Sequence, residues 1–417
     1  MSQVLSPWGY LPDGWNLSTI DEEKTALFDY VANGSFASLA ENVKYRETPD
    51  YAVLIRLVDY NNNFSGDFVY IDEHAYNFLS KSKLYGDEII ISNVGANVGT
   101  VFKAPRLNKK MSLAPNAICV KFKGCNDFYY YWLRSRIGQN IINSLVSGSA
   151  QPKFNKTHFR SMPIPVPPIE IQENIASILS SLDDKIAVNR RICENLEAQA
   201  QALFKHWFID FAPFKNGNFV ESELGMIPEG WRVGKFGDIA DLIKPSIKPI
   251  ENVDYSHYSI PAFDNNRIPS KDNGGTIKSN KFVIHDSVTL LSKLNPDHKR
   301  IWFVSKVGTN AICSTEFLPF YAKDREQSAF VYCYLNCWRN YREIANGAKG
   351  TTNSHQRIDA NAILSRKLAY DKDTISIFCN LVRDLLKLEN KAIQESIYLS
   401  QLRDTLLPKL MSGQIKV

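Results

Sequence analysis

The sequence predicts an α+β protein in which two pseudo-symmetric mixed α/β domains are separated by two long helices that form an antiparallel coiled coil. An internal repeat predicts the two domains, because GYLPDGW at Gly9–Trp15 returns as GMIPEGW at Gly225–Trp231. Each copy is followed by a strand-rich segment, a polar loop and a long amphipathic segment. A chain of 417 residues is also too long for one ordinary core. The predicted parts are residues 1–165, 166–212, 213–372 and 373–417.

Short runs rich in β-branched residues predict strands in both domains, and an aromatic helix follows them in each. The strands are expected at Tyr51–Val58, Asp87–Ser92, Ser287–Ser292 and Ile301–Ser305, and the helices at Phe128–Arg134 and Phe330–Asn336. Before the first long helix, PIPVPP at Pro163–Pro168 enforces an extended backbone. The second copy has Arg366–Asp371 at this place without the prolines, so the sequence defines the start of the second long helix less sharply.

The long helices are expected from about Gln172 to Phe208 and from about Thr374 to Met411. Apolar residues recur in steps of three and four along both, which is typical of a coiled coil, although one such helix alone would also fit a globular core. Asn189 and Glu395 are the polar members, and a buried Asn fixes the register of paired helices. The first seam is Ile175, Leu179, Leu182, Ile186, Asn189, Cys193, Leu196, Ala200, Leu203 and Trp207. The second is Leu381, Leu385, Leu388, Ala392, Glu395, Leu399, Leu402 and Leu406.

The net charge of +5 is concentrated in the two globular segments, with +2 in residues 1–165 and +5 in residues 213–372. From Ile89 to Ile169, eleven bases accompany a single acid, Asp127. Such an excess favours a polyanionic partner such as DNA, although a solvated basic face would look the same. Two basic domains held apart by helices about 55 Å long suit duplex DNA, on which half-sites recur about 34 Å apart.

Composition also limits where the protein works. No apolar run reaches the roughly 18 residues of a membrane span, and because the first residues lack a basic segment followed by an apolar run, we expect no secretory signal. Seven scattered cysteines fit reduced thiols, and we therefore expect a cytoplasmic protein. Cys333 and Cys337 are one helical turn apart, where a buried helix face explains them better than a metal site does. We expect no metal.

Several of these segments resemble the specificity subunit of a type I restriction-modification enzyme, a phage-defence system, over essentially the whole chain. The most specific are Pro163–Ile186, Leu203–Phe208, Leu406–Gly413 and the doubled Pro-acid-Gly-Trp. The resemblance implies that each globular copy is a target recognition domain reading half of a bipartite site in double-stranded DNA. It also implies that the helices form the spacer and bind two methylation subunits, with which a restriction subunit associates. The methylation subunits would carry S-adenosylmethionine and the restriction subunit ATP and Mg²⁺, whereas this chain would bind no cofactor.

Base edges are read by hydrogen-bonding side chains, whereas Lys and Arg on phosphates position the protein. The polar loops before the long helices suit the first task, although they could be ordinary surface loops. Our candidates for base contact are Gln151, Lys153, Asn155, Asn353, His355, Gln356 and Arg357. The glycine-containing segment Asn93–Thr100 is a second candidate, or merely a strand connection. The candidates for phosphate contact are Lys103, Arg106, Lys109, Lys110, Lys156, Lys299, Arg300, Lys306 and Lys349.

An enzyme would need a catalytic motif. The sequence holds neither a Gly-x-x-x-x-Gly-Lys-Ser/Thr phosphate loop nor an Asn/Asp-Pro-Pro-Tyr/Phe adenine-methylation motif. Pro12 and Asp13 with Glu22–Lys24 superficially resemble a nuclease centre, but they lie at the repeated turn and the second copy lacks the acid-x-Lys. We therefore expect a non-catalytic DNA-recognition and assembly subunit. A coiled-coil scaffold that binds proteins and not DNA is the alternative, and a nuclease that cuts alone ranks third.

Overall fold

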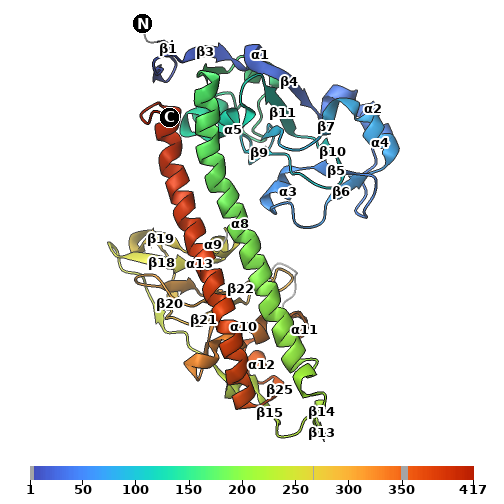
Figure 1. Cartoon of the computed structure of the whole chain (residues 1–417), viewed down its shortest axis with the longest axis vertical. Coiled ribbons are helices and arrows are strands. Elements are labelled where there is room, and N and C mark those ends of the chain that lie inside the picture. Colours follow the sequence, from blue (N-terminus) through green and yellow to red (C-terminus); the bar gives the residue numbers. More distant parts are fainter. Residues whose placement is uncertain (1–3, 266, 349–355) are drawn as a thin grey trace. The chain divides into compact units, whose positions relative to one another are not determined.

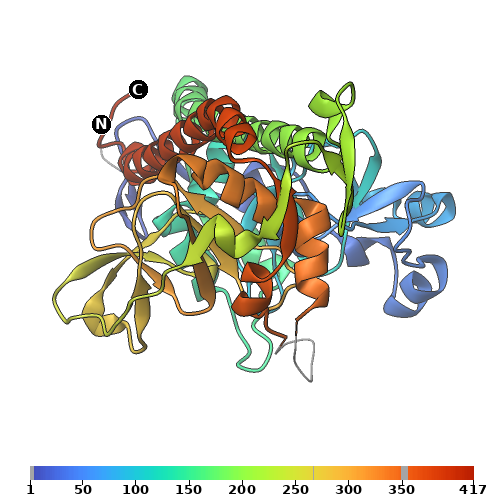
Figure 2. The ribbon, with the colours of Figure 1, turned by 90° about the horizontal axis from the view of Figure 1, so that it is seen from below.

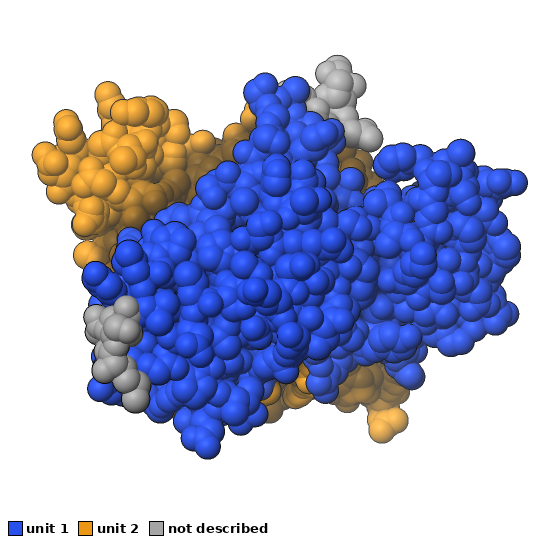
Figure 3. Space-filling model, turned by 90° about the horizontal axis from the view of Figure 1, so that it is seen from above, with its two compact units in different colours: residues 1–185, 399–417 blue, residues 186–398 orange. Residues whose placement is uncertain are grey.

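The computed structural model describes residues 4–265, 267–348 and 356–417 (Figure 1). The chain divides into two compact units, coloured separately in Figure 3. Unit 1 consists of Met1–Lys185 together with Leu399–Val417, and unit 2 is Ile186–Tyr398. Two helices of 40 residues, α8 (Ile169–Phe208) and α13 (Lys372–Met411), each contribute one part to each unit. The predicted division into four functional segments is of a different kind and stays a prediction.

Unit 1 has a central antiparallel sheet in the order β4-β11-β8-β9, covered by the helices α5 and α6. Six consecutive residues of α5, Phe128–Leu133, are buried, because this helix lies inside the domain core. The elements are β4 (Lys24–Asp29), β8 (Ile89–Ser92), β9 (Val101–Lys103), β11 (Ala117–Phe122), α5 (Asn126–Arg134) and α6 (Arg136–Ser144). An outer mixed sheet has the order β6-β5-β10-β7. It comprises β5 (Ala52–Ile55), β6 (Val69–Ile71), β7 (Lys83–Leu84) and β10 (Lys110–Leu113), with α2 (Phe36–Asn42), α3 (Leu57–Asn61) and α4 (Glu73–Phe78).

Unit 2 repeats the central sheet in the order β16-β24-β21-β22, followed by the helices α10 and α11. These are β16 (Ala240–Leu242), β21 (Val288–Ser292), β22 (Ile301–Val304), β24 (Phe317–Ala322), α10 (Ser328–Asn336) and α11 (Trp338–Asn346). Its outer sheet, yellow and gold at the left of Figure 2, has five strands in the order β17-β20-β23-β18-β19. They are β17 (Ser246–Ile247), β18 (Asp254–Tyr258), β19 (Ser270–Asn273), β20 (Lys281–Val283) and β23 (Ile312–Ser314), and α9 (Ile260–Asp264) follows β18.

The predicted strands and aromatic helices are confirmed, although each strand is shorter than predicted and the first is shortened most. The run Tyr51–Val58 gives a strand only to Ile55, and α3 begins at Leu57. Asp59 causes this change of structure. Its carboxylate accepts hydrogen bonds from the backbone N–H of Arg56 (2.8 Å) and from the Arg56 guanidinium (2.6 Å), which stabilises the first turn of the helix.

Both long helices are approached through the same strand pairing. In unit 1, β12 (Pro163–Val166) pairs antiparallel with β3 (Asn16–Thr19). In unit 2, β25 (Lys367–Tyr370) pairs antiparallel with β15 (Arg232–Lys235) although it contains no proline. The pairing with a neighbouring strand, rather than proline itself, therefore holds the backbone extended in the second copy.

The repeated Pro-acid-Gly-Trp is a tight turn. The backbone N–H of Trp15 donates to the carbonyl of Pro12 at 3.1 Å, and that of Trp231 donates to Pro228 at 3.1 Å. The glycines have φ of 82° and 86°, which an L side chain rarely adopts. Each turn buries its tryptophan against the end of a long helix. Trp15 shares a core cluster with Leu410 and Met411 of α13, whereas the Trp231 ring lies 5.7 Å from that of Phe208 in α8.

The antiparallel pairing of α8 with α13 is confirmed within each unit. In unit 1, the Arg403 guanidinium contacts the Asp183 carboxylate at 2.7 Å. In unit 2, the Asn189 amide donates to the Glu395 carboxylate at 2.8 Å, with Asn189 only 1% exposed. Also in unit 2, the Cys193 thiol lies 3.7 Å from the backbone carbonyl of Glu389, so the partner numbers fall on α13 as they rise on α8, as antiparallel helices require. No helix in the described part of the chain is long and apolar enough to cross a membrane.

The predicted seam of α13 is wrong in its first half. Leu381 and Leu388 are 51% and 53% exposed, whereas Val382, Leu386 and Glu389 are buried one position later. This stretch packs on the aromatic core of unit 2 as well as on α8, so its buried face is shifted. From Ala392 onward the predicted phase holds for Ala392, Leu399, Leu402 and Leu406, whereas Glu395 is exposed. Ile175 and Leu179 are buried. Apart from Leu381 and Leu388, the other predicted leucine and isoleucine positions are half-buried: Leu182, Ile186, Leu196, Leu203, Leu385, Leu399, Leu402 and Leu406.

Candidate nucleic-acid interface

Three segments that are distant in sequence meet at one end of β8 and β11, the two inner strands of the central sheet of unit 1. The segment after β8 is tied to the residue before β11, because the N–H of Asn93 donates to the carbonyl of Asn116 at 3.1 Å. It is also tied to the segment after the polar loop, where the N–H of Phe154 donates to the carbonyl of Asn93 at 3.1 Å and that of Gly95 to Pro152 at 2.9 Å. We call this arrangement of 93–95, 116 and 152–154 junction 1.

Unit 2 repeats the arrangement bond for bond. The N–H of Lys293 donates to Glu316 at 2.9 Å, that of Ile358 to Lys293 at 3.0 Å and that of Asn295 to Gln356 at 3.3 Å. We call 293–295, 316 and 356–358 junction 2. In both units the connection after β8 or β21 therefore serves two purposes: it joins two strands and it anchors the polar loop.

The polar loop of unit 1 is closed by a reciprocal pair of bonds between Ser147 and Lys153, of 2.8 Å and 2.9 Å. The side chains of Gln151 and Lys153 are exposed there. In unit 2, Arg357 is 58% exposed and Gln356 is half-buried. The remaining candidates of that loop, Lys349, Asn353 and His355, lie outside the described residues. Base contact by the described candidates stays a prediction.

Asn155 is better explained as a structural residue. Its side-chain oxygen accepts from the backbone N–H of His158 at 2.8 Å and caps α7 (Lys156–Arg160). Asp359 caps α12 (Ala360–Leu364) at the corresponding place, accepting from Asn361 at 2.9 Å. The recurrence of a cap at both places gives this position a role in the fold, and base contact by Asn155 stays a prediction.

Backbone correspondence between the junctions reveals residues that the sequence did not single out. Position 116 is Asn in junction 1 and position 316 is Glu in junction 2, while Asn93 corresponds to Lys293. Asn116 directly precedes β11 and Glu316 directly precedes β24. This correspondence is visible only when the two copies are aligned through these strands. The same backbone therefore presents different polar groups in the two units.

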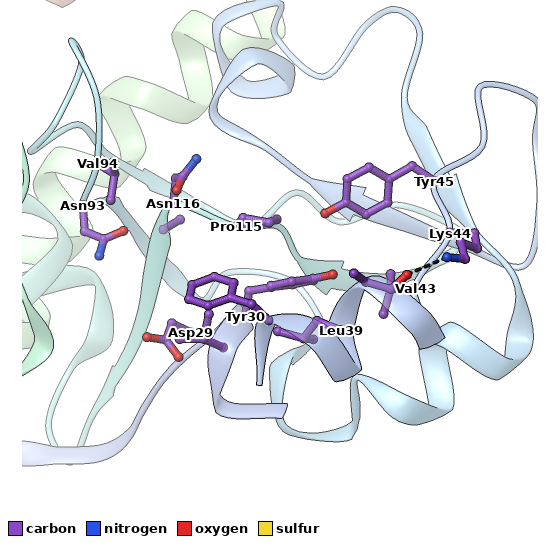
Figure 4. Close-up of a pocket in the computed structure, with 14 residues that line it drawn as sticks. Asp29, Tyr30, Leu39, Val43, Lys44, Tyr45, Asn93, Val94, Pro115 and Asn116 are labelled. Carbon is purple, nitrogen blue, oxygen red and sulfur yellow. Dashed lines mark hydrogen bonds between the residues drawn. The ribbon is translucent and has the colours of Figure 1, made fainter. Parts of the chain in front are cut away.

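A cavity of about 630 Å³ opens beside junction 1 (Figure 4). Asn93, Val94 and Asn116 lie at one end of it, and Lys44 and Tyr45 lie at the other. The Oδ1 atom of Asn93 is buried and accepts no hydrogen bond from the described residues. Junction 1 thus holds an unused acceptor in a partly apolar recess.

Two of the phosphate candidates are held by contacts within unit 2. The Lys299 amine donates to the backbone carbonyl of Asn336, and burial lowers its pKa. Arg300 makes two bonds to the Asp264 carboxylate, of 2.8 Å and 2.9 Å. Neither side chain is placed for phosphate contact in this structure, because each is already held by unit 2 itself. Lys306 is exposed, and its role stays a prediction.

The positive charge of residues 89–169 is partly neutralised by carboxylates that lie outside this stretch of sequence. Six of the eleven bases between Ile89 and Ile169 make ion pairs, and five of the carboxylates come from outside that window. These pairs include the candidates Lys103 with Asp127, Arg106 with Asp87, and Lys156 with Asp29. Lys109 and Lys110 instead lie over the rings of Tyr70 and Tyr51. Their positive charge is therefore not compensated by a carboxylate among the described residues.

A buried ionic cluster links the recognition part of unit 2 to both of its helix segments. Arg267 contacts Glu197 of α8 at 3.2 Å and Glu389 of α13 at 3.7 Å. Burial, and after it the Glu197 charge, raises the pKa of Glu389 to about 7. Burial would also raise the pKa of Glu197, but Arg267 and a 2.8 Å bond from Asn336 lower it.

The fold defines a class of protein: two copies of one α/β domain, each carrying the same junction of loops, built on a shared pair of antiparallel helices. Residues 13–198 match the family described as the Type I restriction modification DNA specificity domain. Over these residues, somewhat under half of the chain, the protein is similar to the type I restriction-modification specificity subunits.

Relatives and a solved structure extend this similarity beyond residues 13–198. The chain is 28% identical over 307 residues to the type I restriction enzyme MjaIX specificity subunit of Methanocaldococcus jannaschii, covering 70% of this chain and 69% of the relative. It is 25% identical to the HindI specificity subunit of Haemophilus influenzae, covering 63% and 71%. The crystal structure of the S subunit from M. genitalium has a TM-score of 0.52 at 16% identity, covering 98% of this chain and 99% of that one. This last likeness concerns the fold alone.

Proposed function

We propose that this chain is the DNA-recognition and assembly subunit of a type I restriction-modification complex and is itself non-catalytic. The target recognition part of each unit reads one half of a bipartite site in double-stranded DNA. The paired helices set the spacer between the half-sites. Two methylation subunits dock on the helices and modify adenine with S-adenosylmethionine, and a restriction subunit that uses ATP and Mg²⁺ joins them in the cytoplasm.

The repeated junction carries the proposal. Two recognition surfaces with one backbone and different side chains are what a protein needs to read two different half-sites. A duplicated enzyme would instead keep the same reactive groups in both copies. Junctions 1 and 2 differ at every position of the three corresponding pairs: Asn93 and Lys293, Asn116 and Glu316, Lys153 and Arg357.

Exposed apolar residues on the long helices support partner docking. Large apolar side chains on a water-exposed helix face favour a protein contact when they gather on one element. On α8 and α13 the exposed ones are Ile169, Val188, Ile192, Ile377, Leu381, Leu388 and Tyr398, between 39% and 64% exposed. The Leu388 side chain points away from the contact between α8 and α13 and is exposed, so a partner can contact it.

A methylome tests the proposal. The chain is expressed with its methylation subunit in a host that lacks adenine methylation, and modified adenines are mapped by single-molecule sequencing. A new motif of two specific parts with a constant spacer is expected. An insertion of four residues in α8 near Asn189 is then expected to change the spacer or to prevent assembly. A methylated motif with a single part would contradict the proposal.

A scaffold that binds proteins and not DNA is the second candidate, and the internal ion pairs of six basic residues favour it. A scaffold would bind the methylation subunits without bringing them to any sequence. Stable, soluble complexes that produce no motif in the methylome would support it over DNA recognition.

A further inference from the structure

Glu316 and Arg357 form a pair at junction 2 that has no counterpart at junction 1. We propose that Glu316 orients Arg357 so that the free edge of the guanidinium reads a guanine in the second half-site. Glu316 is then a positioning residue and Arg357 the residue that contacts the base. This inference rests on the proposed function, which it deepens by naming the base.

Both residues are anchored to the same loop. The backbone carbonyl of Glu316 accepts from Lys293 at 2.9 Å, and the N–H of Glu316 donates to the Ser314 hydroxyl at 3.2 Å. Arg357 pairs antiparallel with Leu294, the next residue of that loop. Main-chain contacts therefore hold the backbones of Glu316 and Arg357 at a constant spacing, independently of the contact between their side chains.

The side chains then make one defined contact. Nη2 of Arg357 donates to Oε1 of Glu316 at 3.1 Å. The Glu316 side chain is 27% exposed and that of Arg357 is 58% exposed, so the carboxylate lies deeper and the guanidinium extends outward. An exposed pair of this kind contributes little to stability, which leaves orientation as its main effect.

The chemistry favours a base over a phosphate. A guanidinium has five N–H donors, and one bond to Glu316 leaves enough for the O6 and N7 acceptors of guanine. Holding the long side chain in one place also reduces the entropy lost on binding. A carboxylate beside the guanidinium opposes the approach of a phosphate anion, whereas guanine presents neutral acceptors.

Junction 1 offers the contrast. Its corresponding residues are Asn116 and Lys153, an amide and an ammonium group that cannot form a carboxylate–guanidinium pair. An ammonium is a point charge without the planar fork that matches guanine. The guanine-reading arrangement therefore belongs to the second half-site alone.

The test uses the assembled complex of this chain with its methylation subunits. Methylation rates are measured on duplexes in which each base pair of the two half-sites is replaced in turn. Wild type is expected to prefer G·C at one position of the second half-site by about ten-fold to a hundred-fold. Arg357→Lys and Glu316→Gln are each expected to reduce that preference at least about five-fold while leaving the first half-site unchanged. Asp241→Asn, which breaks the exposed pair with Lys323 elsewhere in unit 2, is the matched control and should leave every preference intact.

The possible outcomes distinguish a failure of the proposed function from a failure of the roles given to Glu316 and Arg357. If wild type methylates no bipartite site, the proposed function is wrong. If it does, but Glu316→Gln keeps the full G·C preference or weakens all positions equally, Glu316 does not orient a base-reading arginine. If no position of the second half-site requires G·C, Arg357 does not read guanine. A loss confined to one G·C position in both variants supports the inference.

Discussion

Units 1 and 2 have the same central sheet and the same junction, but they differ in what surrounds them. The outer sheet of unit 1 has four strands with α2, α3 and α4 around it, whereas that of unit 2 has five strands and the short α9. At the helix pair, unit 1 has the Asp183–Arg403 ion pair and unit 2 buries Glu389 beside Arg267. The backbone that places the loops has been kept, while the outer sheets and the polar side chains have changed.

This difference distinguishes the main chain, which places the recognition loops, from the side chains that those loops present. Hydrogen bonds between main-chain atoms recur in both junctions because they do not depend on side-chain identity. The side chains that those bonds present can differ between the units, since the main-chain bonds are made whatever the side chain is. Four predictions test this comparison between the two units.

The largest effect is expected in the aromatic core of unit 2. Phe378 is fully buried, with its ring 5.2 Å from that of Phe208 and 5.9 Å from that of Phe204. Phe378→Ala should lower the free energy of unfolding of unit 2 by about 3–5 kcal/mol, measured by urea denaturation. Ile377→Ala, at a neighbouring position that is 54% exposed, should change it by less than about 0.5 kcal/mol. Equal effects of the two variants would contradict the assigned core.

The second prediction concerns pH. The pKa of Glu389 in the folded state, about 7, lies above its ordinary value of 4.5, so the folded protein binds the proton more tightly than the unfolded chain does. The contribution to stability is therefore present below pH 4.5 and is lost as the pH rises to about 7, by about 3 kcal/mol in total. Denaturation between pH 5 and 8 should show this fall in wild type, and Glu389→Gln should flatten it. A wild-type stability that rises over the same range would refute the assignment.

The third prediction transfers the guanine-reading pair from one unit to the other. Asn116→Glu combined with Lys153→Arg places the two side chains of junction 2 on the backbone of junction 1. If the backbones are equivalent, the first half-site should gain a preference for G·C at one position of about ten-fold. Lys153→Arg alone is the control, because it adds the fork without the carboxylate. An unchanged first half-site in a folded, active complex would show that the junctions are not interchangeable.

The smallest effect is expected from single lysines. Lys306 is exposed, whereas the Lys299 amine is held by the Asn336 carbonyl. Lys306→Ala should reduce the slope of log affinity against log salt by about 1, and Lys299→Ala should leave that slope unchanged. Binding to a duplex carrying the methylated motif, measured from low to high salt, distinguishes them. A slope that changes for Lys299→Ala alone would reverse the assignment.

Features repeated or periodic along the chain were predictable. The doubled turn, the aromatic helices and the two long helices follow from local patterns, and the structure has all of them. Features that depend on distant residues were not. The sequence cannot show that Lys156 meets Asp29, that Lys299 lies against Asn336, or that the core of unit 2 shifts the buried face of α13 away from Leu388. The candidate loops could therefore be found from their composition. Asn116 and Glu316 could be found only from the alignment of β11 with β24 in the structure.

The composition of unit 1 from two separate stretches affects the order in which the protein can fold during synthesis. Unit 2 is one continuous stretch, complete once Tyr398 has left the ribosome. Unit 1 begins earlier but needs Leu399–Val417, including Leu410 and Met411, which share a cluster with Trp15. Unit 1 is thus begun first and completed last, and until then the core cluster that contains Trp15 lacks Leu410 and Met411.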